Sequence, residues 1–179
     1  MGKKKITVTL SERGIDDAIK ELDAYKKDIE QKTVKLRKLI GQKIMEYSQQ
    51  GFNGAMVDDI VNGYGESHPA QVEVTVSPDE TVTIVIAKGK DAVWVEFGAG
   101  VYHNGAAGSS PHPNGAELGF TIGDYGYGRG KGKTWGYYTY ENGGKELVLT
   151  HGTPARMPMA IAVSTVLNDI KAIADEVFG

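Results

Sequence analysis

The sequence predicts an α+β fold in which a largely antiparallel sheet is packed by a long N-terminal helical region and a C-terminal amphipathic helix. Apolar residues recur at three- and four-residue steps over residues 14–50 and 157–178, which is the period of a helix with one apolar face. Residues 72–97 instead contain runs that alternate apolar and polar side chains, as half-buried strands do. A chain of 179 residues fits one domain, residues 1–179.

The composition excludes several classes of protein. The formal net charge is -3, so attraction to nucleic acid or to an anionic membrane would need a local basic patch. There is no cysteine, which excludes disulfides, thiolate metal sites and a cysteine nucleophile. No apolar stretch resembles a signal-peptide core or approaches the roughly 20 residues that cross a bilayer. We therefore expect a soluble protein, made inside the cell, with no membrane partner.

The first part of the chain predicts a strand followed by a helical region. Residues 6–10 alternate isoleucine, valine and leucine with two threonines, and Ser11 is a suitable helix cap. The helical region covers residues 14–50, with an interruption expected near Lys27. Its mixed charges predict a solvated face with pairs at i,i+4. Gly51 and the glycines after it are expected to end the region in a loop.

The middle of the chain predicts hairpins. Residues 72–76 and 81–87 alternate around the turn-forming residues 77–80, which indicates an antiparallel pair. Residues 91–97 are expected to form a third strand, and residues 136–150 predict a second hairpin around a glycine-containing turn.

A glycine-rich excursion, residues 98–135, separates these hairpins. It has no sustained period, so we expect a long loop whose order comes from a partner. Residues 157–178 then predict the C-terminal amphipathic helix, whose stripe should cover one sheet face. This stripe consists of Val163, Val166, Ile170, Ile173 and Val177.

Catalytic and ligand-binding patterns are weak. The glycine-rich runs do not match Gly-x-x-x-x-Gly-Lys-Ser/Thr, and no Gly-x-Ser-x-Gly elbow is present. A metal site is the least favoured alternative, because its candidate ligands have the spacing of no known motif. These candidates are His103, His112, Glu117 and Asp124. We expect no enzyme, no metal and no cofactor.

Glu96 is the carboxylate of greatest interest, because it lies within an apolar run. In a strand it would share a face with Trp94, opposite Phe97. No partner for acid catalysis can be identified. We expect a structural or inter-subunit role, in which Glu96 accepts hydrogen bonds from the backbone of Gly98 to Gly100 or pairs with a neighbour's cation.

Aromatic and basic residues interleave between residues 125 and 138, a composition typical of segments that stack bases and contact phosphates. They are Tyr125, Tyr127, Arg129, Lys131, Lys133, Trp135, Tyr137 and Tyr138. Three interpretations stay open at this point. The segment could bind single-stranded nucleic acid, its aromatic residues could pack in a strand or an interface, or it could line a channel for DNA without reading bases.

Two motifs carry a family resemblance. Residues 95–100 read Val-Glu-Phe-Gly-Ala-Gly, and residues 152–159 read Gly-Thr-Pro-Ala-Arg-Met-Pro-Met at the start of the last helix. In order and placement, these motifs resemble those of the neck, head–tail joining and tail-completion proteins of tailed bacteriophages. Members of that family typically carry Val-Glu-Phe-Gly-Thr-Gly and a later run of glycine, proline and an aromatic residue.

The resemblance implies a structural virion protein that forms a ring, a homohexamer, in the neck or tail of a phage made in the cytoplasm of its bacterial host. Its partners would be other copies of itself, the connector and tail-tube proteins, and DNA that passes through the lumen without being read. The candidate docking residues are Trp94, Glu96, Phe97, Gly98, Gly100, Tyr125, Tyr127, Arg129, Lys131, Lys133, Trp135 and Arg156. A tail terminator that caps the tube and a small single-stranded nucleic-acid-binding protein are the alternatives.

Overall fold

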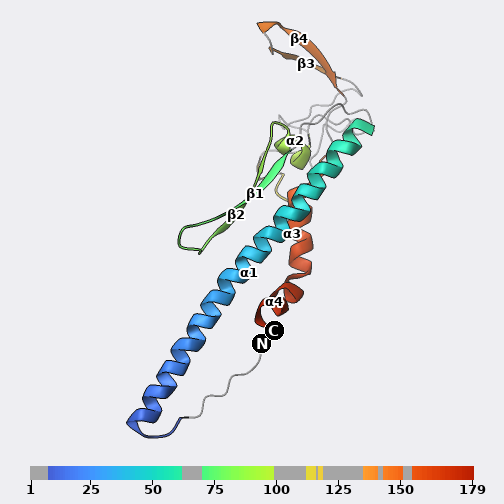
Figure 1. Cartoon of the computed structure of the whole chain (residues 1–179). Helices are drawn as coiled ribbons and strands as arrows, with labels where there is room; N and C mark the ends of the chain where they lie inside the picture. The colour runs from blue at the N-terminus through green and yellow to red at the C-terminus, as the bar shows by residue number, and fades with distance from the viewer. Residues whose placement is uncertain are drawn as a thin grey trace.

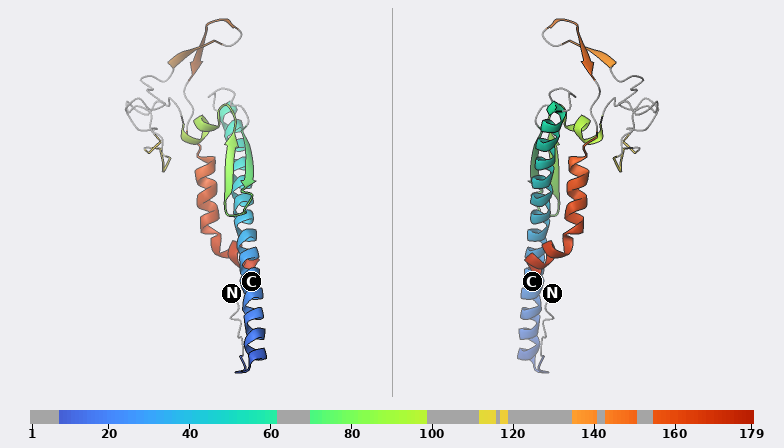
Figure 2. Two further views of the ribbon diagram at one scale, coloured as in Figure 1. Left: turned by 90° about the vertical axis from the view of Figure 1, so that its left-hand side faces the viewer. Right: turned by 90° about the vertical axis from the view of Figure 1, so that its right-hand side faces the viewer.

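The computed structural model describes residues 8–61, 70–98, 112–115, 117–118, 135–140, 143–150 and 155–179. It confirms an α+β fold, built on one long helix, α1 (Glu12–Val61) (Figure 1). A hairpin of β1 (Gln71–Val76) and β2 (Thr83–Lys88) packs on α1, as do α3 (Pro158–Asn168) and α4 (Ile170–Phe178). Figure 2 shows α3 and the hairpin beside one another along α1.

The long helix α1 is continuous, so the interruption expected near Lys27 is wrong. Ser11 caps it as predicted, because the Ser11 hydroxyl accepts the N–H of Gly14 at 3.2 Å. Pairs at i,i+4 join Lys26 to Glu30 and Asp28 to Lys32 around the expected break, at 3.9 and 3.0 Å. Such pairs support a solvated helix modestly. With 50 residues, α1 is about 75 Å long.

Gly51 does not end the helical region, which continues to Val61. A Cβ added to Gly51 would lie 2.8 Å from the Cβ of Pro158 and 3.2 Å from its Cα. The glycine therefore permits the close approach of α1 and α3 instead of breaking α1. The loop expected after the helix falls on residues 62–69, outside the described residues.

The N-terminal strand is not formed in the described residues. Val8 and Thr9 have no regular structure, and Leu10 lies in a bend before the cap of α1. The rest of the expected strand lies outside the described residues. A strand needs a neighbour to pair with, and α1 carries this segment away from β1 and β2.

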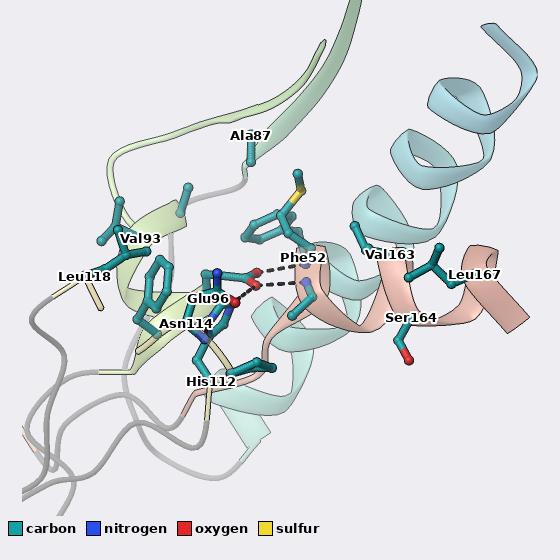
Figure 3. A pocket seen from close by; sticks show the side chains of 15 residues that line it. Phe52, Ala87, Val93, Glu96, His112, Asn114, Leu118, Val163, Ser164 and Leu167 are labelled. Carbon is teal, nitrogen blue, oxygen red and sulfur yellow. Dashed lines mark hydrogen bonds and ion pairs between the residues drawn. The ribbon is translucent and has the colours of Figure 1, made fainter. Parts of the chain in front are cut away.

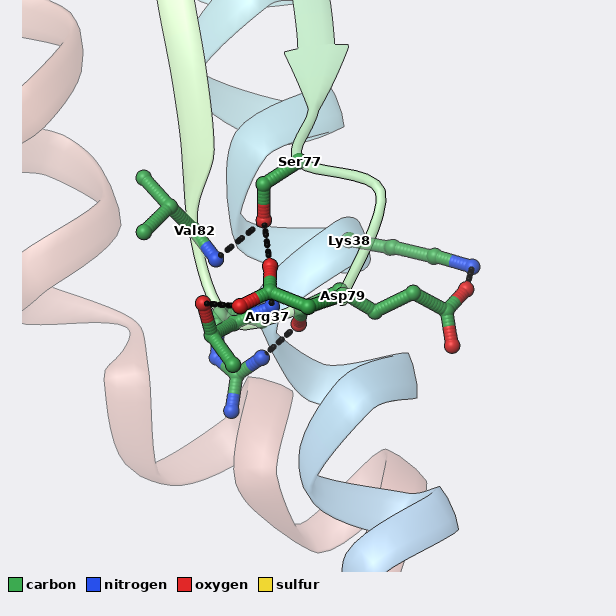
Figure 4. Close-up of polar contacts among 7 residues, drawn as sticks. Arg37, Lys38, Ser77, Asp79 and Val82 are labelled. Carbon is green, nitrogen blue, oxygen red and sulfur yellow. Dashed lines mark hydrogen bonds and ion pairs between the residues drawn. The ribbon is translucent and has the colours of Figure 1, made fainter.

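The first hairpin is confirmed. β1 and β2 pair antiparallel with Val74 opposite Val85, and Val72 is buried against the helix. The Gln49 side chain of α1 donates to the carbonyl of Ala70 at 2.8 Å and accepts the N–H of Val72 at 2.9 Å. At the other end, the turn is tied to α1 by Arg37 and Lys38, which contact Glu80 (Figure 4).

The third strand is wrong: these residues form the short helix α2 (Ala92–Phe97). Its buried residues are Ala92, Val95 and Glu96, the i, i+3, i+4 spacing of one helix face. A strand would place Val95 and Glu96 on opposite faces. Tertiary packing therefore overrides the β propensity of this run of valines and aromatic residues.

The second hairpin is confirmed, with β3 (Trp135–Thr139) antiparallel to β4 (Glu146–Thr150). It forms a separate two-stranded sheet, not part of a common sheet. In Figure 1 it lies beyond the C-terminal end of α1. Apart from residues 98, 112–115, 117–118 and 135, the predicted glycine-rich loop lies outside the described residues.

The C-terminal helix is two helices separated at Asp169, and both pack on α1 instead of covering a sheet face. Within the predicted stripe, Val166, Ile173 and Val177 are buried, whereas Val163 and Ile170 are exposed. The main core cluster lies between α1, β1 and α2, around Phe52 with Ala55, Ala70, Val72, Ala92 and Val95, and Met159 of α3 packs against it. Within the described residues, no helix is long and apolar enough to span a membrane.

Candidate functional site

The start of α3 lacks a cap of its own. Met157 occupies the N-cap position in the left-handed region, with φ 53°, and makes no side-chain capping bond. Pro158 follows as the first helical residue and has no N–H to satisfy. The N–H of Ile161 bonds within the helix, to the carbonyl of Met157 at 2.9 Å. The N–H groups of Met159 and Ala160 thus need an acceptor from elsewhere.

Glu96 supplies that acceptor from α2. Its carboxylate accepts the N–H of Met159 at 2.8 Å and that of Ala160 at 2.9 Å (Figure 3). Glu96 is only 6 % exposed. A negative charge at a helix N-terminus also complements the partial positive charge of the helix dipole. The carboxylate therefore caps α3 across a gap of more than 60 residues in sequence.

His112 completes the shell of donors around the carboxylate. Its Nε2 lies 2.9 Å from a Glu96 oxygen, and its Nδ1 accepts the N–H of Asn114 at 3.0 Å. Because Nδ1 is an acceptor, the proton of the neutral ring is on Nε2, which donates to Glu96. The ring also packs on Phe97, with ring centroids 4.2 Å apart. We call Glu96, His112 and the amides of Met159 and Ala160 the Glu96 cap.

The two segments that carry the family resemblance meet at this cap. The N–H of Arg156 donates to the carbonyl of Val95 at 2.8 Å, next to the bonds made by Glu96. Gly98 ends α2 with φ 77°, a backbone conformation that favours glycine. The motifs 95–100 and 152–159 are therefore in direct contact through their described residues.

An apolar groove of about 590 Å³ lies over the cap. One wall comes from β2 and α2, the other from α3, and Phe52 of α1 lies between them (Figure 3). Met159 also lines the groove. We call it the β2–α3 groove; its exposed apolar residues are Val93, Leu118, Val163 and Leu167. Glu96 also lines it, but both carboxylate oxygens already accept hydrogen bonds. The groove is thus suited to apolar side chains and not to acid–base chemistry.

The predicted docking residues are only partly brought together. Trp94, Glu96, Phe97, Gly98 and Arg156 lie at or next to the cap. Trp135 lies in β3, opposite Thr150 in the separate hairpin. Gly100, Tyr125, Tyr127, Arg129, Lys131 and Lys133 lie outside the described residues.

The alternative metal site is not assembled in the part of the chain that the structure describes. There, no three histidine, aspartate or glutamate side chains gather as a metal would require. His103 and Asp124 are outside the described residues, and Glu117 is exposed. Both ring nitrogens of His112 already make hydrogen bonds, Nε2 to Glu96 and Nδ1 to the N–H of Asn114.

Sequence reasoning found Glu96 but missed its partners. The expected partners were the backbone of Gly98 to Gly100, most of which lies outside the described residues, or a neighbour's cation. The observed donors are the amides of Met159 and Ala160 and the ring of His112. One signal was available: Pro158 begins a helix without Ser, Thr, Asp or Asn before it. A helix start without its own cap indicates an acceptor from another segment.

Comparisons with protein-family models, with curated proteins and with solved structures found no match to this chain.

Proposed function

We propose that this chain is a ring-forming structural protein of the neck of a tailed phage or phage-like particle, where it joins the head connector to the tail. The observation that carries the assembly part of this proposal is the apolar surface. In the described residues, eleven apolar residues are buried, five of them alanine, whereas eighteen large apolar side chains are exposed. Several adjacent exposed apolar residues mark surfaces that bind partners.

The exposed residues are distributed over several separate elements. Ile15, Ile19 and Leu22 follow the first turns of α1, and Ile84 and Ile86 lie on β2. A third group lies on α3, and a fourth, Tyr138, Leu147 and Leu149, lies on the β3–β4 hairpin. Several different patches on one subunit suit head-to-tail association, which produces a ring when the rotation closes.

The two motifs that resemble the neck family are in contact, and the carboxylate in one holds the helix that begins in the other. The identity of the partners, connector and tail tube, rests on this resemblance. The exposed apolar surface and the sequence resemblance support a tail terminator equally, because a terminator differs from a neck ring only in the partner that it binds.

The test is the mass of the purified protein by light scattering over a range of concentrations, followed by negative-stain images and by mixing with phage connector and tail-tube proteins. Closed rings of one size that bind the connector are the expected result. Rings that bind only tail tubes would favour the terminator. A monomer that binds neither connector nor tube would overturn the proposal.

One observation favours the nucleic-acid alternative enough to test it. Tyr138 and Tyr140 are 55 % and 71 % exposed, and the Lys145 ammonium lies 3.9 Å from the centroid of the Tyr138 ring. Exposed aromatic residues beside a cation can stack bases and contact phosphates. Binding of single-stranded DNA that weakens steeply with salt and is lost in Tyr138→Ala would support this function.

A further inference from the structure

The N-terminal alternating segment lies too far along α1 to reach β2 of its own subunit. Leu10 is 97 % exposed and Val8 is 49 % exposed. β2 lies against α1 at Gly41, where an added Cβ would meet the side chain of Thr83. Ser11 and Gly41 are 30 residues apart on an unbroken helix, which is about 45 Å. Ten extended residues reach at most about 35 Å, so residues 6–10 cannot lie along their own β2.

The outer edge of β2 is open among the described residues. The N–H of Ser77 bonds to the carbonyl of Val82, so these two residues form a hydrogen-bonded pair. Hydrogen-bonded and non-hydrogen-bonded pairs alternate along an antiparallel ladder, so the next hydrogen-bonded pairs are Thr75 with Ile84 and Glu73 with Ile86. The N–H and C=O groups of Thr83, Val85 and Ala87 therefore point away from β1. On β1, the equivalent edge is partly closed by Gln49, which binds the N–H of Val72. An unpaired edge of this kind is a template for another strand.

The β2–α3 groove lies beside this edge. Ala87 of β2 lines it, as do Val163 and Leu167 of α3, which are 40 % and 61 % exposed. A strand added to β2 would direct alternate side chains to one face. Ile6, Val8 and Leu10 alternate in this way, and apolar side chains match the lining of the groove.

We propose that residues 6–10 of a second copy add as a parallel strand to the outer edge of β2, with their apolar side chains over the β2–α3 groove. Charge selects the direction. A parallel strand brings the three lysines 3–5 to the end of β2 near the carboxylate of Asp79, whereas an antiparallel strand brings them to Lys88 and Lys90. The neighbouring Glu80 is already paired with Lys38. This inference rests on the proposed ring, for which it names the contact between neighbouring subunits.

The contact joins two different patches, the N-terminal segment of one copy and the β2 edge of the next. It is therefore heterologous and can propagate around a ring. Main-chain hydrogen bonds would supply affinity, and the groove would supply specificity for the apolar side chains, as in other cases of strand addition.

The first test compares Leu10→Ser with two control variants, Thr7→Ser and Thr9→Ser, both of which change the opposite face of the alternating segment. Leu10 is almost fully exposed in the single chain, so the melting temperature of the dissociated subunit should not change. Self-association should weaken by about tenfold or more in Leu10→Ser alone, because a buried leucine is lost from the contact. Equal association of Leu10→Ser and the controls would overturn the inference.

The second test uses the absence of native cysteine. The double variant Leu10→Cys, Ala87→Cys should be joined between subunits by a short bis-maleimide, whereas Leu10→Cys, Thr83→Cys should not. Cross-linking of the second pair instead would overturn the parallel direction. Rings that form with neither pair cross-linked would overturn strand addition while leaving the ring intact. A wild-type protein that never associates, alone or with the connector, would instead refute the proposed function.

Discussion

Two carboxylates in this chain each accept three hydrogen bonds, but they join parts of the fold that differ greatly in separation. Asp79 accepts from the Ser77 hydroxyl at 2.6 Å and from the N–H and hydroxyl of Thr81 at 3.2 and 2.8 Å. All its donors lie within two residues, in the turn between β1 and β2 (Figure 4). Glu96 instead joins α2 to His112 and to the start of α3.

The two carboxylates also differ in their access to water. Asp79 is exposed, and hydrogen bonds from the hydroxyl of Ser77 and from Thr81 lower its pKa from 3.8 to about 2. Glu96 is buried, so water cannot take the place of its carboxylate as the acceptor for the surrounding donors. A lost partner costs little where water can take its place and much where a buried donor is left unsatisfied. Burial, more than the number of hydrogen bonds, thus decides how much each carboxylate stabilises the fold.

The largest predicted effect is on the Glu96 cap. Glu96→Ala leaves two helix amides and His112 without their acceptor, so the free energy of unfolding should fall by about 3–5 kcal/mol. Glu96→Gln should lower the free energy of unfolding by less, because the amide oxygen of Gln can still accept a hydrogen bond. It should still destabilise the fold, because the NH₂ group of Gln faces a donor. Urea unfolding measures both.

The matched control for these variants is Glu73→Ala, which removes a carboxylate paired with Lys88 on the surface of the hairpin. It should change the stability by at most about 1 kcal/mol. If Glu96→Ala and Glu73→Ala lowered the free energy of unfolding equally, burial would not explain a greater contribution of the Glu96 cap than of a surface ion pair.

The comparison also shows how far sequence reasoning can reach. The Asp79 turn was predicted because Ser-Pro-Asp-Glu contains its own donors and acceptors within a few residues. The Glu96 cap was not predicted, because its donors are His112 and two backbone amides some 60 residues away. The uncapped start at Pro158 indicates that an acceptor is needed but does not specify which residue supplies it. The same limit explains α2: its run of valines and aromatic residues predicts a strand, whereas the position of α3 requires Val95 and Glu96 on one face.

The elements that were predicted correctly are those with a long or strict period. The helical character of residues 14–50 and both hairpins follow from apolar spacing and turn residues, although the expected break near Lys27 and end at Gly51 do not occur. The errors concern the role of a glycine within a helix and which elements pack against one another. Gly51 in the sequence could end a helix or admit a close neighbour, and only the approach of Pro158 decides between them.

The second predicted effect tests that approach through a pair of glycines in α1. Gly51→Ala should destabilise by about 1–3 kcal/mol, since the new Cβ meets the rigid ring and backbone of Pro158. Gly54→Ala has no atom within 4 Å of its new Cβ and should stabilise by up to about 1 kcal/mol through helix propensity. Thermal unfolding of both variants compares them directly. A stabilising Gly51→Ala would show that the start of α3 can shift away from α1, contrary to a tight Glu96 cap.

The smallest predicted effect belongs to Asp79, and pH reveals it. Because its pKa is lowered in the folded protein, ionised Asp79 adds stability above pH 3.8, and this contribution is lost as the pH falls through about 2. The melting temperature of wild type minus that of Asp79→Asn should therefore be small and constant at neutral pH, and should shrink toward zero between about pH 4 and pH 2. Other carboxylates titrate in both proteins and cancel in the difference. A difference that stayed constant down to pH 2 would mean that the turn does not need the charge, and that the hydroxyl and amide donors hold it equally well around a neutral side chain.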